Sequence, residues 1–158
     1  MSEPTIDFPK IWAELGERFQ AEQSSIHGPD HWQRVEAHGI TLVEQTPGAD
    51  IIVVRLFAVL HDSQRMNDYG DPEHGPRAAD FAQKMQGEWY SIQDQQLDQL
   101  VEACRFHTDG TTTEDPTIGC CWDADRLDLT RVYIEPDPDF MSTKFGKELA
   151  ASSQQSSL

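Results

Sequence analysis

The sequence predicts an all-α fold for this chain of 158 residues. Apolar residues recur at intervals of three and four along most of the chain, which is the spacing of one face of a helix. Several of these stretches follow an aspartate or contain an early proline, as the first turn of a helix often does. The one long apolar run, residues 51–60, exceeds the length of a typical buried strand. These observations favour helices around a single core.

The first two helices are predicted at residues 8–21 and 29–44. Asp7 is a candidate N-cap for the first helix, and Pro9 suits its first turn. The second helix begins at Pro29. The candidate core residues are Phe8, Ile11, Trp12, Leu15 and Phe19 in the first helix and Trp32, Val35, Ile40 and Val43 in the second.

The third predicted helix covers the apolar run 51–60. Its β-branched residues 51–54 alone would favour a strand, and periodicity does not decide a run that is apolar on every side. The run continues to Leu60, and Asp50 offers an N-cap, so we predict a helix. Residues 63–72 are rich in Asp, Asn and Gly and are predicted to form a loop.

The second half of the chain is predicted to add shorter elements. Helices are expected at residues 73–85, 92–106 and 122–132, with a polar loop at 108–119 and an acidic loop at 135–139. The serine- and glutamine-rich residues 151–158 are expected to be disordered. Residues 1–150 then form a single domain, because no repeat or linker divides them.

Composition excludes several classes of partner. The net charge of -16, from 12 basic and 28 acidic side chains, argues against binding a nucleic-acid polymer or an anionic membrane. The three cysteines form no CxxC pair and no even set, which favours a reducing, cytoplasmic location. The first residues show no signal peptide, and no apolar run reaches about 18 residues, so neither secretion nor membrane spanning is expected. Nothing in the sequence indicates the oligomeric state.

The pair His61-Asp62 closes the apolar run. Burying a charged group is costly unless it is paired or bound to a metal, so a histidine and an aspartate at this point favour a metal site. Further possible ligands occur along the chain, and the full order is His31, His61, Asp62, His74, His107 and Asp125.

Three motifs together resemble the HD-domain superfamily of metal-dependent phosphohydrolases. They are His31-x-x-Arg34-Val35, Leu60-His61-Asp62 and the segment from Asp123 to Asp128, and they lie within residues 26–129. The resemblance implies a compact helical bundle with a metal site at its centre. It implies His31, His61, Asp62 and Asp125 as the core ligands, because the matching aspartate directly precedes a basic residue. Asp123 is then a fallback ligand or a residue that supports the ligands.

His74 and His107 match the extra histidines of the two-metal branches of that superfamily. Asp62 is the natural bridge between two ions and belongs to the expected catalytic centre. The short interval after Asp62 leaves open that His74 contacts the substrate instead of a metal. Imidazoles with carboxylates suit one or two ions of Fe, Mn, Ni, Co or Zn better than Mg or Ca.

Other charged residues near these motifs have two interpretations each. Arg34, Arg65 and Arg126 are candidates to hold phosphate oxygens of the substrate, although exposed arginines commonly pair with any nearby carboxylate. Glu73 is a candidate general base or an anion at a helix start. His27 belongs either to the surroundings of the ligands or to a helix cap, and Asp128 is expected to hold a helix in place.

The resemblance implies hydrolysis of a small phosphorylated molecule, a nucleotide or another phosphomonoester, by a metal-activated water. The chain contains neither a G-x-S-x-G elbow nor a Walker loop that would indicate other chemistry. One alternative is a di-iron oxygenase, because relatives with the fuller histidine set bind two irons. A second alternative is a sensor that binds metal or nucleotide without catalysis.

Overall fold

The computed structural model describes residues 5–21 and 25–156, and within these residues it contains helices and no strand beyond one isolated bridge. The all-α prediction is therefore confirmed. No helix in the described ranges combines the length and the apolar character needed to cross a membrane. The helices are α1 (Phe8–Arg18), α2 (Pro29–Glu44), α3 (Ile51–Leu60), α4 (His74–Met85), α5 (Asp94–Phe106), α6 (Pro116–Leu127) and α7 (Lys144–Ser156), with two short 3-10 helices, η1 (Asp128–Val132) and η2 (Pro138–Phe140).

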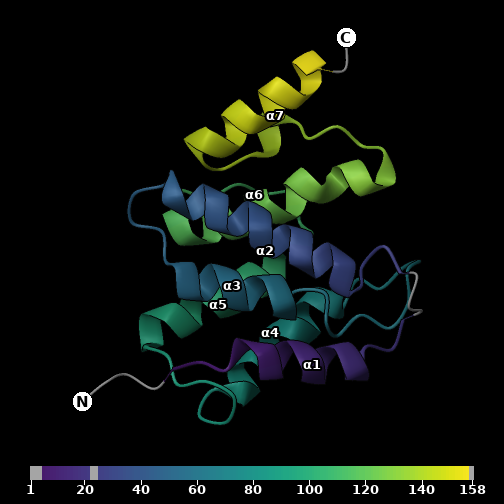
Figure 1. Cartoon of the computed structure of the whole chain (residues 1–158), viewed down its shortest axis with the longest axis vertical. Coiled ribbons are helices and arrows are strands. Elements are labelled where there is room, and N and C mark those ends of the chain that lie inside the picture. Colours follow the sequence, from purple (N-terminus) through teal and green to yellow (C-terminus); the bar gives the residue numbers. More distant parts are fainter. Residues whose placement is uncertain (1–4, 22–24, 157–158) are drawn as a thin grey trace.

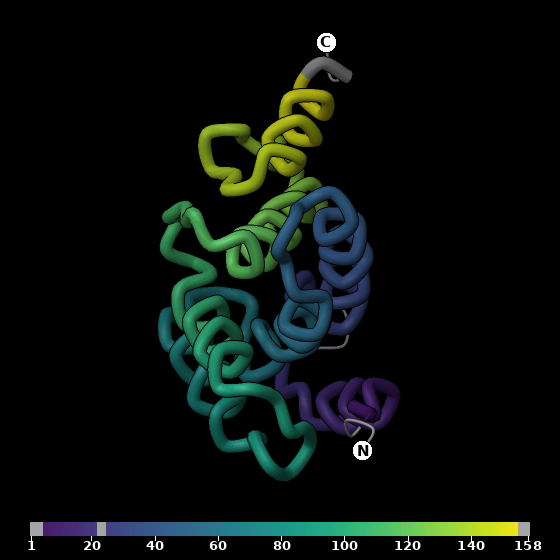
Figure 2. Tube along the Cα trace, turned by 90° about the vertical axis from the view of Figure 1, so that its left-hand side faces the viewer, coloured from purple at the N-terminus to yellow at the C-terminus, as the bar shows by residue number. Residues whose placement is uncertain are grey.

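The helices pack around α3. Helices α1, α2, α5 and α6 all contact it, while α4 packs mainly against α5 and α7 packs against α6 and η2. Figure 1 shows α1 and α7 at opposite ends of the long axis, and the view in Figure 2, turned by 90°, agrees. The centre of the bundle is therefore the place where α2, α3, α5 and α6 meet.

Helix α3 forms the middle of the core. Seven of its ten residues are buried, as expected for a helix that is apolar except for Arg55, which pairs with Glu36. Asp50 caps its start, because the carboxylate accepts hydrogen bonds from the backbone N–H groups of Ile52 and Val53. The predicted helix is correct from Ile51 to Leu60, so the cap and the length of the run outweighed the β-branched residues at its start.

Two predictions in the first helices need correction. Helix α1 ends at Arg18 and not at residue 21, because Phe19 is extended and packs edge-on against Trp32. Ile40, predicted to be in the core, is 36% exposed. It lies one residue after Gly39, which faces α3 so closely that an added Cβ would lie 2.5 Å from a methyl group of Val54.

The loop predicted at residues 108–119 is shorter than expected. Helix α6 begins at Pro116, where the Asp115 carboxylate accepts hydrogen bonds from the N–H groups of Thr117 and Ile118. The helix predicted at residues 122–132 is the second half of α6 followed by η1, which tightens the chain after Leu127.

The C-terminal prediction was wrong for residues 151–156, which are helical and continue α7; residues 157–158 lie outside the described part. The helix starts where the Thr143 hydroxyl accepts a hydrogen bond from the N–H of Gly146, 2.9 Å away. Ala150 is fully buried, and the Gln154 side chain donates to the carbonyl of Pro136. Packing and capping therefore order a segment that its polar composition alone would leave unfolded.

Candidate metal centre

The site is built around the end of α3. His61 is the residue directly after this helix and is fully buried, while Asp62 is 3% exposed. Because α3 runs through the middle of the core, its last turn delivers this histidine and carboxylate to the centre of the bundle. The other donors reach the same point from α2, α4 and α6 and from the residue that follows α5.

One cluster of donors surrounds Oδ2 of Asp62. This oxygen lies 3.4 Å from Nε2 of His31 and 3.6 Å from Nε2 of His61. The two imidazole nitrogens are 3.1 Å apart. Oδ1 of Asp125 completes the group at 3.1 Å from His31 Nε2 and 3.4 Å from His61 Nε2. The four residues predicted as core ligands therefore converge on one point.

A second cluster surrounds the other oxygen of the same carboxylate. Oδ1 of Asp62 lies 3.2 Å from Nε2 of His74 and 3.2 Å from Nε2 of His107. These two nitrogens are 3.0 Å apart. The two oxygens of Asp62 thus face two separate sets of histidines, which is the arrangement of a bridging carboxylate.

The backbone and one carboxylate fix the orientation of all four histidines. Nδ1 of His31 donates to Asp128, and Nδ1 of His61 donates to the carbonyls of Phe57 and Ala58. Nδ1 of His74 donates to the carbonyl of Asp71, and Nδ1 of His107 donates to the carbonyl of Cys104. In every case Nε2 is left to face the cluster, as in histidines that bind metals.

The spacing and the chemistry of these donors fit divalent transition metals. Two donors that each lie about 2.1 Å from one ion are roughly 3.0 to 3.4 Å apart, depending on whether the geometry is octahedral or tetrahedral. The donor–donor distances given above run from 3.0 to 3.6 Å, close to this range. Two buried triads, His31-His61-Asp62 and Asp62-His74-His107, have donors close enough to hold an ion. Four imidazoles with two carboxylates match Fe, Mn, Co, Ni or Zn.

In the absence of a metal ion, the carboxylates and histidines of the site stabilise one another's charged forms. Burial by itself raises the pKa of Asp62, but nearby His61 and hydrogen bonds from His107 and His27 outweigh it and hold the pKa well below its usual range. Burial likewise lowers the pKa of His31, but hydrogen bonds with Asp125, Asp128 and Asp62 outweigh it and raise the pKa to about 10. A binding metal ion therefore has to displace the His31 proton.

Asp128 has a more direct role than the sequence indicated. Its Oδ2 lies 2.6 Å from Nδ1 of His31, and both of its oxygens accept from Nε of Arg34. Arg34 is therefore engaged with Asp128 and does not line the pocket described below, so its predicted contact with substrate phosphate is not supported. The spacing from Asp125 to Asp128, one helical turn, is the signal in the sequence that could have placed both carboxylates beside His31.

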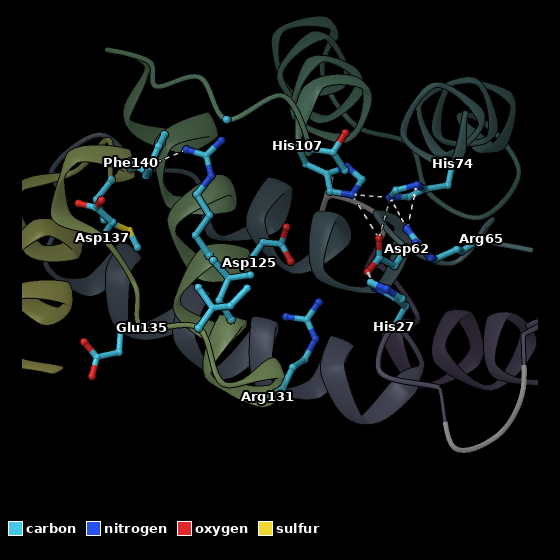
Figure 3. A pocket seen from close by; sticks show the side chains of 16 residues that line it. His27, Asp62, Arg65, His74, His107, Asp125, Arg131, Glu135, Asp137 and Phe140 are labelled. Atoms are coloured by element: carbon cyan, nitrogen blue, oxygen red, sulfur yellow. Dashed lines mark hydrogen bonds and ion pairs between the residues drawn. The ribbon is translucent and has the colours of Figure 1, made fainter. Parts of the chain in front are cut away.

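A cavity of about 480 Å³ opens beside the donors. Figure 3 shows His74, His107 and Arg65 at one end of it, Asp125 in the middle, and Asp137 and Phe140 at the other end. The sequence did not indicate that residues of the segment after η1 form this far wall. The lining residues are His27, Asp62, Arg65, His74, His107, Thr108, Gly110, Asp125, Arg126, Leu129, Arg131, Ile134, Glu135, Asp137, Phe140 and Met141.

Arg65 and His27 lie beside the donors. Nη1 of Arg65 is 3.1 and 3.3 Å from the two ring nitrogens of His74. Nδ1 of His27 is 3.3 Å from Oδ2 of Asp62, and the tryptophan at position 32 fixes this segment by donating to the carbonyl of His27. His27 therefore lies beside the donors and lines the cavity.

Two predicted site residues point elsewhere. The Asp123 carboxylate accepts from the N–H groups of Ser142 and Thr143 and from the Thr143 hydroxyl, so it holds the start of α7 and not a metal. Glu73 is exposed before α4, makes no capping hydrogen bond and does not line the cavity. Its placement removes the reason to expect a general base there.

No protein-family model matches the chain, and no curated protein matches it in sequence. In structure, it matches the crystal structure of a predicted HD superfamily hydrolase from an uncultured Thermotogales bacterium. The TM-score is 0.72 at 20% identity, over 93% of this chain and 84% of that chain. The resemblance predicted from the three motifs is therefore confirmed at the level of structure: this chain has the all-α fold of that predicted HD superfamily hydrolase. The histidine and aspartate cluster described above lies at the centre of this chain's own bundle.

Proposed function

We propose that the protein is a metal-dependent phosphohydrolase that acts on a small phosphorylated molecule, a nucleotide or another phosphomonoester. The observation that carries this proposal is the bridging position of Asp62, whose two oxygens face separate sets of histidines at one end of an open cavity. The similar Thermotogales protein is itself a predicted HD superfamily hydrolase, which supports the same broad class of chemistry.

The histidines and aspartates of the centre would bind two metal ions in the proposed reaction. His31, His61, Asp62 and Asp125 would hold one divalent ion, and His74 and His107 with the second oxygen of Asp62 would hold another. Divalent ions, when bound, lower the pKa of coordinated water toward neutrality and neutralise phosphoryl oxygens.

Arg65 adds a fixed positive charge at the same end of the cavity. Its Nε donates to the carbonyl of Asn67 at 2.7 Å and it is 8% exposed, so the guanidinium is held beside the second cluster before substrate arrives. A protein of net charge -16 needs such local charge to attract a phosphate.

The test measures phosphate release from a panel of nucleotides and simple phosphomonoesters with Mn, Co, Ni or Mg added in turn. The wild type is compared with Asp62→Asn, which keeps the side-chain shape, and with Asp98→Asn on the exposed surface of α5 as a matched control. Release by the wild type and the control that is lost in Asp62→Asn supports the proposal. Equal release by all three proteins contradicts it, because the activity then comes from a contaminant.

A di-iron oxygenase is the second candidate, and the four imidazoles are the observation that favours it, since this donor set suits iron well. It would show bound iron, an optical spectrum and oxygen uptake in place of phosphate release. Of these two candidates, Arg65 favours the phosphohydrolase, because a cation fixed beside the metal donors suits an anionic substrate.

A further inference from the structure

Arg131 presents a partly free guanidinium to the cavity. Its Nε donates to the carbonyl of Ile26 at 2.8 Å, and its Nη1 donates to the carbonyl of Asp128 at 2.9 Å. Nη2 has no hydrogen-bond partner among the described residues. The side chain is 12% exposed and lines the cavity. Two backbone carbonyls from distant parts of the chain therefore hold this cation in place, and one of its nitrogens is left for a ligand.

The other two arginines of the cavity wall have no such nitrogen. Arg65 donates from Nε and Nη2 to backbone carbonyls of its own loop, and its Nη1 lies 3.1 Å from a ring nitrogen of His74. Arg126 donates from Nη1 to the carbonyl of Phe140, and its Nη2 is buried, so it is not open to a substrate. Arg131, which the sequence pattern did not single out, is therefore the arginine of this wall with a nitrogen that is neither bonded to a described residue nor buried.

Arg131 lies beside the first cluster of donors. Its Nη1 is 3.9 Å from Oδ2 of Asp128, and that oxygen is 2.6 Å from Nδ1 of His31. Figure 3 shows the guanidinium pointing from η1 toward the space between Asp125 and His27, two residues that border the same cluster. A group bound at the first cluster is therefore the ligand that this guanidinium faces.

The charges of the cavity wall favour the phosphoryl group over a second anionic group as that ligand. The ion pair between Arg131 and Asp128 is 3.9 Å long, so the charge of Arg131 is only partly compensated. The opposite end of the cavity has two carboxylates, Glu135 and Asp137, and one cation, Arg126. A second anionic group that extended to this end would meet more negative than positive charge, whereas a phosphoryl group stays at the metal donors.

We infer that Arg131 binds an oxygen of the substrate's phosphoryl group from the side of the first cluster, while Arg65 is fixed beside the second. Arg131 is then a further substrate-binding residue of the proposed reaction. A guanidinium suits this role because it donates charge-assisted hydrogen bonds in fixed directions. Its two backbone anchors also mean that little side-chain freedom is lost on binding. The inference rests on the proposed function, because it assumes that a phosphoryl group binds at the metal donors.

The test measures binding directly, by titration calorimetry on the Mn²⁺-loaded protein. The probe is methylphosphonate, which has the oxygens of a phosphoryl group and no second anionic group. We expect Arg131→Met to bind it about tenfold more weakly than the wild type, as the loss of one hydrogen bond from a charged donor allows. Mn²⁺ content, measured on the same samples, should stay at the wild-type level, because Arg131 supplies no metal donor.

The matched control is Arg34→Met. Arg34 is the other arginine that pairs with Asp128, but it does not line the cavity. The control therefore removes the same charge beside the same carboxylate without touching the proposed contact. It should bind methylphosphonate within about twofold of the wild type. Arg131→Lys keeps the charge in the cavity wall and should recover part of the binding that Arg131→Met loses.

A crystal structure of the Mn²⁺-loaded wild type with methylphosphonate tests the inference even if Arg131→Met fails to fold. A phosphonate oxygen is expected within about 3.2 Å of Nη2 of Arg131, the usual limit for such a hydrogen bond. A phosphonate bound at the metals without this contact overturns the inference.

The possible failures are distinguishable. Unchanged binding in Arg131→Met overturns the inference, and so does an equal loss in Arg34→Met, because the effect then passes through Asp128. If Arg131→Met weakens binding of phosphonoacetate but not of methylphosphonate, Arg131 binds a second anionic group and the inference fails. If methylphosphonate binding depends on Arg131 but no ester releases phosphate, the contact stands and the proposed function fails. Absence of methylphosphonate binding by the wild type overturns the inference, and the phosphate-release assay then decides the proposed function by itself.

Discussion

At the scale of single residues, the candidate centre depends on hydrogen bonds at the side of each histidine that faces away from it. Three of the four imidazoles use backbone carbonyls for this purpose, and only His31 uses a side chain, the carboxylate of Asp128. A carboxylate partner makes the imidazole a stronger ligand and fixes the nitrogen that bears the proton. Asp128 is therefore the most informative residue to change without touching a donor.

Asp128→Asn is expected to weaken metal binding by about 10- to 100-fold, because His31 loses its charged partner while its own donor atom stays. Competition of the metal-free protein with a chelator for Mn²⁺ or Co²⁺ measures this directly. The matched control is Asp80→Asn, which removes an exposed ion-pair partner of Arg105. Unchanged affinity in Asp128→Asn would show that its hydrogen bond does not tune His31.

The choice between Asp123 and Asp125 is a second question at this scale. The sequence pattern favoured Asp125, and the structure places its Oδ1 3.1 Å from Nε2 of His31. Burial raises the pKa of Asp123 in spite of the hydrogen bonds that it accepts from Ser142 and Thr143. Asp123 is buried and faces the start of α7, whereas Asp125 is half-buried and faces the cluster.

Asp123→Asn is expected to lower the free energy of unfolding by about 1–3 kcal/mol, because the amide cannot accept all three hydrogen bonds and places a donor against a donor. Urea unfolding measures the loss. Metal content, measured on the same samples, should stay at the wild-type level, whereas Asp125→Asn should lose metal. Loss of metal in Asp123→Asn with normal stability would reverse the assignment.

At the scale of elements, the second cluster depends on how closely α4 approaches α5. Gly75 follows His74, and a Cβ added to it would lie 2.9 Å from the carbonyl oxygen of Arg105 and 3.0 Å from that of Cys104. The Cys104 carbonyl also holds His107. The glycine thus lets the two helices come together where their histidines meet.

Gly75→Ala is expected to destabilise the protein by about 1–3 kcal/mol, because the added methyl meets backbone atoms that cannot move aside. It should also separate His74 from His107 and so weaken binding of a second metal ion. Denaturant unfolding and metal stoichiometry measure the two effects. The control is Gly16→Ala in α1, where nothing lies within 4 Å of the added carbon; it should stabilise by about 0.5–1 kcal/mol. Binding of a second metal ion by Gly75→Ala with wild-type stoichiometry would show that the second site does not depend on the close contact between α4 and α5.

The helix starts predicted from the sequence agree with the structure where a capping aspartate precedes an apolar stretch. Asp7 and Asp50 precede apolar residues, and both helices begin where expected. Asp115 caps α6 in the same way. The polar residues that precede Asp115 led the sequence analysis to place Asp115 and the first turn of α6 in a loop. Helix α7 was missed because its apolar residues, Phe145, Leu149 and Ala150, are few and their burial depends on contacts with distant parts of the chain.

At the scale of the whole molecule, the metal donors could be predicted from the sequence, whereas the far wall of the cavity could not. His61 and Asp62 could be found because ionisable residues at the end of an apolar run need a physical reason, and the order of the three motifs supplied the rest. The far wall of the cavity comes from residues 129–141, whose positions depend on the packing of η2 and α7. No periodic pattern in the sequence marks these residues, so the substrate end of the site became visible only in three dimensions.

The donors also connect most of the bundle, since they come from α2, α4, α6 and the residues that follow α3 and α5. An ion bound only by the folded state stabilises it by mass action, by about 2.7 kcal/mol when the free metal is about 100 times its Kd. For a chain of this size the gain corresponds to roughly 5–10 °C in Tm. We therefore expect Mn²⁺ to raise the Tm of the chelator-treated protein by such an amount.

The acidic surface makes the control decisive. With 28 acidic side chains, the protein will attract divalent cations at many exposed positions, and reduced repulsion alone could raise the Tm. Asp62→Asn keeps that surface and removes only the bridging charge, so its Tm should respond much less to Mn²⁺ than that of the wild type. Scans at low and high ionic strength separate the two contributions further, because salt screens the exposed charges and leaves a buried centre largely unaffected. An equal, salt-sensitive rise in both proteins would show that the metal acts on the surface and that the buried cluster is not its site.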